Sequence, residues 1–580
     1  MKYHKIIAGT FDNRPNRFIA YVDIMGKMER VHVKNTGRCK ELLIPGAEVY
    51  LEESENRERS TRYDLVAVRK NDRLINMDSQ APNKAVEEWL REDGLLPQTT
   101  LVRPETQYRH SRFDFYMETA DTRNFIEVKG VTLEQEQTAL FPDAPSERAV
   151  KHIEELIEAK KEGYGAYLIF VIQMKGITHF EPNKTTQPAF AEALIRAREA
   201  GVHILSYDCQ ITEDSMRIDQ PVSVKLSVLD EIAEPLLTWY DRGRRILPWR
   251  EEPTPYHVWV SEIMLQQTRV EAVKPYYDQF MTVLPDIAAL AKADEETLLK
   301  LWEGLGYYNR VRNLHKAAVQ IMEQYQGVMP SAYEDLLQLV GIGSYTAGAV
   351  SSIAFGQSVP AVDGNVLRVL ARLRLDDRDI SLQRVKQSIE RELKAAMPLD
   401  RPGDFNQALM ELGAMTCIPN GAPKCGECPW EGLCEAHRCG LETKYPVKAA
   451  KKARTIEEKT ILVLRDAQKT ALHKRPDKGL LAGMYEFPTM EGHRTEEEVL
   501  EFLKEKGLHA IRIQRLAAAK HIFTHKEWHM IGYAIRVDEL ATAQQEMQDN
   551  GYLFVETEEA ERKYPIPSAY AAYYGTLFTL

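Results

Sequence analysis

Two acidic residues, Glu262 and Asp363, and a glycine turn between them are the part of this sequence best suited to chemistry. A carboxylic acid and a carboxylate placed around a glycosidic bond can protonate the leaving group and stabilise the sugar cation that forms. The turn contains Gly341 and Gly343 and precedes a helical pattern, so its backbone N–H groups can bind a phosphate at a helix N-terminus. Together these features predict an enzyme that cuts glycosidic bonds in DNA.

Each of these residues also has an ordinary structural interpretation. Taken alone, Glu262 is a solvated helix residue, Asp363 is a helix N-cap and Gly341 is part of an interhelical turn. Their order along the chain, with Tyr345-Thr346-Ala347-Gly348 directly after the turn, favours the functional interpretation.

Four cysteines are gathered in one short loop, Cys417, Cys425, Cys428 and Cys434, with gaps of seven, two and five residues. A zinc ribbon normally offers two Cys-x-x-Cys pairs, whereas this loop has one pair, and four thiolates in one loop suit a [4Fe–4S] cluster. The odd total of seven cysteines argues against a secreted disulfide framework. We therefore expect a [4Fe–4S] cluster and a reducing, cytoplasmic location.

The composition is that of a large globular protein. With 580 residues, of which 44% are apolar and 28% charged, about three to five domains are expected. No apolar run approaches the ~18 residues that span a bilayer, and the start lacks the apolar stretch of a signal peptide. The net charge of −11 speaks against nucleic-acid binding as a crude rule, but a local basic surface would suffice. We expect a monomer, although the sequence leaves the oligomeric state open.

The elements that must position these residues change along the chain, and the pattern predicts a multidomain α+β protein. Short alternating runs predict a β barrel, mixed patterns predict α/β structure, and helical spacing dominates from Asp230 to about residue 415. The expected domains are 1–75 (barrel), 76–228 (α/β), 229–416 (all-α), 417–441 (cysteine loop), 442–455 (basic linker) and 456–580 (α/β).

Residues 230–435 resemble the helix-hairpin-helix DNA glycosylases, and among them the MutY-type adenine DNA glycosylases. The resemblance rests on the cysteines and on the stretches 247–250, 261–268, 301–308, 339–343 and 362–366. It implies that adenine opposite 8-oxoguanine, or opposite guanine, is flipped out of duplex DNA and hydrolysed from its sugar in base excision repair.

The same resemblance implies roles for four residues. Glu262 would be the general acid that protonates the leaving adenine, which requires a pKa raised by desolvation. Asp363, ionised, would stabilise or trap the sugar cation, Asn365 would orient Asp363 or the water, and Tyr345 would hydrogen-bond near Asp363. Because endonuclease III enzymes carry a Schiff-base lysine where this chain has Tyr345, we expect a monofunctional glycosylase.

Other residues resemble the DNA contacts of this family. Gln266, Gln267 and Tyr307 match wedge residues, which fill the base stack after flipping. Core packing is the alternative for Tyr307 and Tyr308, and we assign Tyr307 to DNA and Tyr308 to the core. The expected DNA contacts of this region are Arg250, Gln266, Gln267, Thr268, Tyr307, Gly341 and Gly343.

Residues 456–580 resemble the Nudix-like domain of MutY proteins through the stretch 478–488. Phe523, Thr524 and His525 match the loop that recognises 8-oxoguanine in that family, with an ordinary strand end as the alternative. The Arg-Glu pair of a Nudix hydrolase is missing at the proper spacing, so we expect no nucleotide pyrophosphatase activity.

Residues 1–228 resemble the sugar fermentation stimulation protein A (SfsA) family through the stretches 35–37, 113–115, 126–129 and 141–148. That family implies an OB-fold followed by a DNA-binding, PD-(D/E)xK nuclease-like domain. In a hairpin, Asp114 and Glu127 would be diagonal neighbours roughly 7–8 Å apart and could share one Mg²⁺. Lys129 would then steady the attacking water or the phosphate. A cross-strand salt-bridge cluster is the alternative.

Two other functions compete with adenine removal. An endonuclease III-type lyase acting on oxidised pyrimidines is one, and Tyr345 and the C-terminal domain speak against it. A DNA-binding regulator with a vestigial glycosylase scaffold is the other, and the intact Glu262, Asp363 and Asn365 speak against that.

Overall fold

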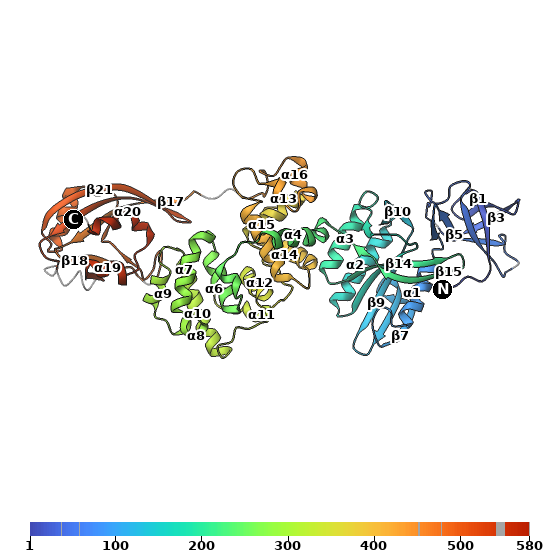
Figure 1. Cartoon of the computed structure of the whole chain (residues 1–580), viewed down its shortest axis with the longest axis horizontal. Coiled ribbons are helices and arrows are strands. Elements are labelled where there is room, and N and C mark those ends of the chain that lie inside the picture. Colours follow the sequence, from blue (N-terminus) through green and yellow to red (C-terminus); the bar gives the residue numbers. More distant parts are fainter. Residues whose placement is uncertain (36, 57, 450–452, 477, 541–550, 579–580) are drawn as a thin grey trace. The chain divides into compact units, whose positions relative to one another are not determined.

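The computed structural model describes residues 1–580 apart from 36, 57, 450–452, 477, 541–550 and 579–580 (Figure 1). Residue contacts divide the chain into two compact units, residues 1–235 with 391–396 and residues 236–390 with 397–580. Each unit is described by itself below. Thr36 of the SfsA-like stretch and residues 450–452 of the expected linker lie outside the described residues.

The first 76 residues form the barrel that the sequence predicts. Six strands follow the order β3-β2-β1-β4-β5-β6, and β3 also pairs with β5, which closes the sheet. Side chains alternate across β2, where Ala20 and Val22 are buried and Tyr21 is exposed. The strands are β1 (Ile6–Asn13), β2 (Ile19–Ile24), β3 (Lys27–Val33), β4 (Glu48–Glu53), β5 (Tyr63–Lys70) and β6 (Arg73–Asn76).

The α/β domain that follows is built on a mixed sheet in the order β15-β14-β12-β9-β8-β7. Its central strands β9, β12 and β14 are parallel. Helices α2 and α3 pack on one face and α1 on the other, so β12 is buried on both faces and its sequence is continuously apolar. The elements are α1 (Ala81–Arg91), β7 (Thr99–Tyr108), β8 (Ser111–Thr119), β9 (Arg123–Val131), α2 (Glu147–Lys161), β12 (Gly165–Ile172), α3 (Pro188–Glu199), β14 (His203–Thr212) and β15 (Ser215–Pro221).

A small second sheet and a short helix complete this unit. The sheet has the order β10-β11-β13-β16. The elements are β10 (Leu133–Gln135), β11 (Thr138–Phe141), β13 (His179–Pro182), β16 (Ser223–Val224) and the 3₁₀ helix η1 (Val228–Glu231).

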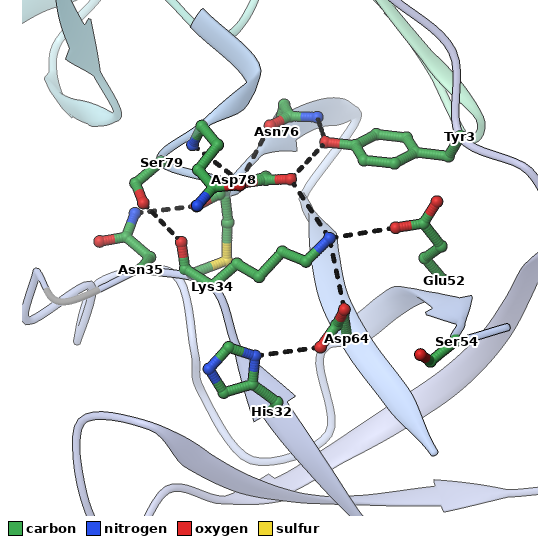
Figure 2. Close-up of polar contacts among 12 residues, drawn as sticks. Tyr3, His32, Lys34, Asn35, Glu52, Ser54, Asp64, Asn76, Asp78 and Ser79 are labelled. Carbon is green, nitrogen blue, oxygen red and sulfur yellow. Dashed lines mark hydrogen bonds and ion pairs between the residues drawn. The ribbon is translucent and has the colours of Figure 1, made fainter. Parts of the chain in front are cut away.

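A polar network joins the barrel to the α/β domain (Figure 2). Lys34, directly after β3, lies 3.1 Å from a carboxylate oxygen of Glu52, 3.3 Å from one of Asp64 and 3.7 Å from one of Asp78. Asp78 is fully buried and also accepts a hydrogen bond from the Tyr3 hydroxyl at 3.3 Å. Because Asp78 lies in the segment between β6 and α1, the network fixes the start of the second domain against the barrel.

Helices dominate the next region, as the sequence predicts. Short breaks separate them, and most helices bury one apolar face in a single core. The helices are α4 (Ala233–Gly243), α5 (Pro248–Glu251), α6 (Pro255–Leu265), α7 (Val270–Val283), α8 (Ile287–Lys292), α9 (Glu295–Leu301), α10 (Asn309–Gln324), α11 (Tyr333–Leu336), α12 (Ser344–Ile353), α13 (Gly364–Arg374), α14 (Gln383–Ala396), α15 (Pro402–Met415), η2 (Cys425–Glu427), η3 (Glu431–Leu433) and α16 (Glu435–Cys439).

The C-terminal domain is a separate α/β structure. Its sheet has the order β19-β18-β17-β22-β21, with β20 paired to β17 and β23 paired to β18. Met484, from the 478–488 loop, is buried in the core of the helical domain. The elements are β17 (Thr455–Arg465), β18 (Lys469–Lys474), β19 (Tyr485–Glu486), β20 (Thr489–Glu491), α17 (Glu496–Glu505), β21 (Ala510–Ile522), β22 (Lys526–Val537), β23 (Tyr552–Glu556), α19 (Thr557–Lys563), η5 (Ser568–Tyr570), α20 (Ala571–Tyr574) and η6 (Gly575–Phe578).

The helices were compared with the length and apolarity that a membrane span requires. Within the described part of the chain, none is both long enough and apolar enough to span a bilayer.

Candidate active site

Glu262 and Asp363 are positioned by two different helices. Helix α6 starts at the N-cap Thr254, whose side chain accepts from His257 N, and Glu262 lies near its C-terminal end. Asp363 is the N-cap of α13, and its carboxylate accepts hydrogen bonds from the backbone N–H of Asn365 at 2.9 Å and of Val366 at 2.8 Å. The capping interpretation of Asp363 is therefore confirmed, and it holds the carboxylate in one orientation.

The environment of Glu262 favours the protonated form of its carboxyl group. Its side chain is buried within the helical domain. Burial, helped by the negative charge of Asp363, raises the pKa of Glu262 to about 7, although the hydrogen bond from Tyr345 acts in the opposite direction. A carboxylic acid at this position can donate a proton near neutral pH.

Asp363 is held by donors on several sides. Asn365 donates from Nδ2 to Asp363 Oδ2 at 2.7 Å, and the Asn365 Oδ1 accepts from Arg368 Nη2 at 3.0 Å. Burial raises the pKa of Asp363, whereas the N–H donors of Val366 and Asn365 and the charge of Arg368 lower it. Asn365 therefore lies where the sequence predicts, directly beside the carboxylate.

Tyr345 contacts the other carboxyl group. Its hydroxyl donates a hydrogen bond to Glu262 and lies 3.0 Å from the sulfur of Met410. We expected this hydrogen bond near Asp363. The partner is Glu262, reached from the first turn of α12, and the charge of Asp363 acts on both groups. Burial raises the pKa of Tyr345 well above its ordinary value, so the hydroxyl stays a neutral donor.

The glycine turn precedes α12. Gly341 has φ = +79°, and a Cβ there would lie 2.6 Å from Asn313 Cβ, so glycine is required. Gly343 is the N-cap of α12, whose first turn carries no acidic residue. Both glycines are exposed. The Ser344 hydroxyl, at the first position of the helix, donates to Glu390 at 2.9 Å. Phosphate binding at this helix N-terminus stays a prediction.

Gly348 brings α12 close to the segment that leads to Asp363. A Cβ at position 348 would lie 2.2 Å from the carbonyl oxygen of Pro360 and 3.3 Å from Ala361 Cα. The contact sets the separation between the helix that carries Tyr345 and the segment that leads to Asp363.

The two tyrosines of the 301–308 stretch have different surroundings. Tyr307 is 49% exposed and Tyr308 is 6% exposed, in agreement with the expected division between surface and core. Gln267 and Tyr307 both have positive φ, +59° and +50°, which is uncommon for residues with side chains. Gln266 ends α6 and lies beside Thr268, whose hydroxyl donates to the Gln266 carbonyl at 3.4 Å.

Arg250 has an internal partner in place of the expected DNA contact. Its Nη2 donates to Glu411 at 2.7 Å, and Nη1 donates to the Arg245 carbonyl at 3.1 Å. Glu411 is fully buried and also pairs with Arg245. Since a buried carboxylate needs its partners, Arg250 serves this ion pair, and the predicted DNA contact is not supported.

The C-terminal loop 523–525 is the turn of the β21–β22 hairpin. Phe523 packs edge-on against Trp528, with ring centroids 4.8 Å apart, while Thr524 and His525 are exposed. The Thr524 hydroxyl lies 3.1 Å from the hydroxyl of Tyr307. The loop expected to recognise 8-oxoguanine and the expected wedge residue therefore lie next to each other.

The cysteines of the short loop are all free and partly accessible. The four of them, Cys417, Cys425, Cys428 and Cys434, line one hollow together with Arg372 and Trp430. Burial, together with the negative charges of Glu442 and the neighbouring thiolates, raises the pKa of Cys425 to about 11, and burial with the neighbouring thiolates raises that of Cys428 to about 12. Such thiols lose their protons only when a bound metal ion replaces the protons.

This donor set fits an iron–sulfur cluster. Four sulfurs face a single hollow, and Arg372 Nη1 donates to Cys417 Sγ at 3.2 Å, as expected around an anionic cluster. Cys425, His437 and Glu442 also lie together, with ligand atoms within 4.8 Å, but a four-thiolate set accounts for more of the loop.

The nuclease-like residues of the first unit also come together. The β8–β9 hairpin pairs residues from Glu118 with Arg123 to Phe115 with Ile126, and Asp114 and Glu127 follow directly after the last pair. The charge of Glu127 acts on Asp114, so the two carboxylates are neighbours; the diagonal arrangement stays a prediction. Asp114 accepts from Val128 N at 2.8 Å and from Asn83 Nδ2 at 2.8 Å.

Glu127 is the most enclosed member of this group. Its Oε1 accepts from Lys129 and contacts His152 Nδ1, while Oε2 is buried without a partner among the described residues. Burial raises the pKa of Glu127, but the His152 hydrogen bond and the Lys129 charge together hold it below its usual value. Burial and the charge of Glu127 raise the pKa of Asp114. A divalent cation fits this arrangement because an ionised, partly unpartnered carboxylate is available to bind it.

The sequence did not single out several residues that hold these sites. Arg368 donates from Nε to the Cys417 carbonyl at 2.9 Å and from Nη2 to the Gly413 carbonyl at 2.7 Å, and so links the cysteine loop to Asn365. His152 and Asn83 play supporting parts at the nuclease-like group. Arginine three residues after Asn365 is compatible with any exposed helix face, so only the tertiary structure reveals its role.

Comparison with known proteins agrees with this architecture. Four family profiles match the chain: SfsA N-terminal OB domain (13–77), sugar fermentation stimulation protein RE domain (80–215), HhH-GPD superfamily base excision DNA repair protein (260–395) and NUDIX domain (460–574). A sugar fermentation stimulation protein homolog of Clostridium beijerinckii is 56% identical over 226 residues, which cover 39% of this chain and 100% of that protein.

Two solved structures are each similar to a part of this chain. The SfsA of Pyrococcus furiosus in complex with Ca²⁺ is 29% identical and covers 39% of this chain and 98% of its own, with a TM-score of 0.37. A thermostable thymine-DNA glycosylase is 28% identical and covers 37% of this chain and 97% of its own, with a TM-score of 0.34. The chain therefore belongs to the sugar fermentation stimulation protein family through its N-terminal part, to which a helix-hairpin-helix base excision repair glycosylase domain and a Nudix domain are fused.

Proposed function

We propose that the glycosylase part removes adenine paired with 8-oxoguanine, or with guanine, from duplex DNA. The observation that carries this proposal is the buried Glu262, whose pKa is about 7, beside a second carboxylate at Asp363. A neutral carboxylic acid suits a purine leaving group, because a purine ring nitrogen can accept its proton as the glycosidic bond breaks.

The mechanism divides the work between the two carboxyl groups. Glu262 gives its proton to the extruded base, and the departing adenine leaves positive charge on the sugar. Asp363, held by Asn365 and the start of α13, lies ready to stabilise that cation or to bond to it until water completes the hydrolysis. Tyr345 fixes the orientation of Glu262 through its hydrogen bond.

The C-terminal domain supports the choice of the opposite base. We propose that Thr524, flanked by Phe523 and His525, reads 8-oxoguanine, and the 3.1 Å contact with Tyr307 supports this because it places the loop next to a residue that would enter the stack. The remaining DNA contacts that we propose are Gln266, Gln267, Thr268, Gly341 and Gly343.

The experiment that tests this function is a single-turnover assay on duplexes with adenine opposite 8-oxoguanine, guanine or thymine. We expect base release from the first two. Release from thymine pairs alone would refute the proposal. Asp363→Asn should abolish release while binding to the same duplex persists.

An endonuclease III-type lyase is the second candidate for the same domain, since the family match alone does not separate the two reactions. A lyase forms a Schiff base between a lysine and the sugar, and Tyr345 cannot do this. Borohydride added during the reaction traps such an adduct. We expect no trapped complex, and a covalent one on gels would replace our proposal with the lyase.

For the first unit we propose metal-dependent cleavage of DNA. Asp114 and Glu127 would hold Mg²⁺ and Lys129 would steady the water or phosphate, supported by the buried, unpartnered Glu127 Oε2. Mg²⁺-dependent cleavage by the full chain should disappear in Lys129→Ala and on chelation, while base release continues in the chelator. Equal cleavage by wild type and variant would reject this site.

We further propose that Cys417, Cys425, Cys428 and Cys434 hold a [4Fe–4S] cluster, which would order the loop. A broad visible absorbance that is lost in Cys428→Ala would support it. We propose a cytoplasmic monomer, with the domain limits 1–75, 76–228, 229–416, 417–441, 442–455 and 456–580.

A further inference from the structure

Arg310 is a half-buried arginine between the two segments that we propose enter the DNA. It lies in the first turn of α10, three residues after Tyr307, and its guanidinium points into the domain. Burial lowers the pKa of Arg310 to about 10, so it still carries its charge at neutral pH. Among the described residues, no carboxylate forms an ion pair with it.

Carbonyl oxygens surround the guanidinium on both sides. Toward the end of α6, Nη1 donates to Ile263 O at 2.7 Å, Met264 O at 3.0 Å and Gln266 O at 2.7 Å. Toward the segment before α10, Nη2 donates to Leu305 O and Gly306 O, each at 3.1 Å. Nη2 also reaches the Thr268 hydroxyl at 3.4 Å.

The acceptors of Nη1 lie at the C-terminal end of α6. The last carbonyls of a helix have no partner within it and form its negative end, so a cation there is favourable. The guanidinium carbon also lies 5.4 Å from the Trp302 ring centroid and 5.6 Å from that of Tyr307. The charge is therefore compensated by backbone dipoles and ring faces.

Both segments contain residues with positive φ, a backbone conformation that an unconstrained loop would not keep. Gln267 has φ = +59° and Tyr307 has φ = +50°, and Gly306 between Leu305 and Tyr307 has φ = +70°. Residues with side chains populate this region only when their surroundings hold them there. Arg310 bonds to the carbonyls directly before Gln267 and Tyr307, and so constrains both.

We propose that Arg310 is a positioning residue that joins the segments 266–268 and 305–307 into one preformed wedge for base flipping. This inference rests on the proposed glycosylase function. Arg310 acts through the backbone carbonyls of Gln266 and Gly306 and the hydroxyl of Thr268, and need not touch DNA. A planar guanidinium can bond to both segments at once, whereas a lysine ammonium is a single point and cannot.

The consequence is a specific loss in the flipping step. If the wedge is not preformed, its two halves must be ordered while the base leaves the stack, so fewer molecules reach the flipped state. The Glu262 and Asp363 arrangement remains, and binding to undamaged duplex, which depends on phosphate contacts, should change less than twofold, whereas flipping and release should fall about 10- to 100-fold.

The test uses the full chain and a duplex in which 2-aminopurine, a fluorescent adenine analogue, replaces adenine opposite 8-oxoguanine. Wild type should increase the fluorescence as the analogue unstacks. Arg310→Met and Arg310→Lys should reduce both this increase and single-turnover adenine release. Arg242→Met, at an exposed arginine on α4, is the matched control and should behave as wild type.

Chemical rescue separates positioning from a general structural role. In Arg310→Ala, added N-ethylguanidine should restore a substantial part of the fluorescence change, because it can occupy the same set of carbonyls. Loss of release with an unchanged fluorescence increase would overturn the inference. A second result would also overturn it: all three variants lose the fluorescence increase, N-ethylguanidine does not restore it, and the loss parallels a fall in melting temperature.

The outcomes also distinguish the proposed adenine glycosylase function from the proposed role of Arg310. If wild type flips the analogue but releases no adenine, the proposed function fails and the role of Arg310 can still be measured. If wild type releases adenine and the Arg310 variants flip as wild type does, only the role of Arg310 fails. Should Arg310→Met not fold, Arg310→Lys, which keeps the charge and most of the packing, carries the comparison.

Discussion

Tyr345 donates its hydroxyl hydrogen to Glu262, from the first turn of α12 to the last turns of α6. The two residues are far apart in the sequence, and the turn at Gly341–Gly343 starts the helix that brings them together. The bond favours the ionised form of Glu262, while burial favours the protonated form and prevails. Burial and the Tyr345 hydrogen bond thus act in opposite directions, and together they place the pKa of Glu262 near neutral pH.

The rate of adenine release should depend on pH through Glu262. Its pKa of about 7 means that the reactive, protonated form predominates below pH 7 and decreases about tenfold per pH unit above it. The rate should also fall at acidic pH, as Asp363, whose pKa is raised, takes up a proton. Single-turnover rates between pH 4.5 and 9, with DNA binding measured in parallel, check this. A rate that is constant from pH 6 to 9 would contradict the assignment of the acid.

Tyr345→Phe removes the hydroxyl and leaves the ring in place. Because the hydrogen bond from Tyr345 lowers the pKa of Glu262, its loss should move the alkaline limb of the pH profile to higher pH. The maximal rate should also fall, by about tenfold, since Glu262 loses its orientation. Tyr308→Phe is a control at a buried tyrosine outside this site. An alkaline limb that stays in place would show that the bond does not act on the acid.

Arg368→Met should uncouple the cysteine loop from the Asp363 site. The variant leaves the carbonyls of Cys417 and Gly413 and the side chain of Asn365 without a buried donor. We expect a loss of about 1–3 kcal/mol in the free energy of unfolding and a lower rate of base release at saturating enzyme. Arg384→Met, at an exposed position of α14, should have neither effect. If Arg368→Met has the melting temperature and the rate of base release of wild type, the hydrogen bonds of Arg368 do not stabilise the protein or couple the two sites.

Lys34→Met tests the network between the barrel and the α/β domain. Removal of the ammonium leaves the buried Asp78 and Asp64 with fewer partners, which should cost about 2 kcal/mol, between the values for exposed and buried pairs. The first thermal transition of the full chain should shift downward. Lys27→Met, an exposed lysine of the same barrel that pairs with Glu29, is the control. Equal shifts in the two variants would mean that the network adds no stability.

Local patterns in the sequence predict much of this fold. Alternation predicts the barrel, the helical period predicts the region around α6 to α15, and strands expected at 460–464 and 530–537 lie within β17 and β22. These features depend on neighbours a few residues apart, which a sequence displays directly. The burial of Tyr308 and exposure of Tyr307 followed from motif position in the same way.

The partners of individual polar groups could not be predicted so well. Arg250 was expected at DNA and pairs with Glu411, about 160 residues away in the chain. Tyr345 bonds to Glu262, 83 residues before it in the chain, and Asp114 accepts from Val128 N across the β8–β9 hairpin. Such choices depend on angstrom-scale distances between distant segments, and residue type alone does not encode them.

Gly348 places a limit on how this site can vary. Glycine inside a helix is less stable than alanine by about 1 kcal/mol, so replacement by alanine would ordinarily strengthen α12. Here the added methyl group would collide with the Pro360 carbonyl at 2.2 Å and push Tyr345 and Asp363 apart. Alanine at 348 should therefore lower the melting temperature as well as the rate of base release, so selection for heat tolerance and selection for repair should both retain this glycine.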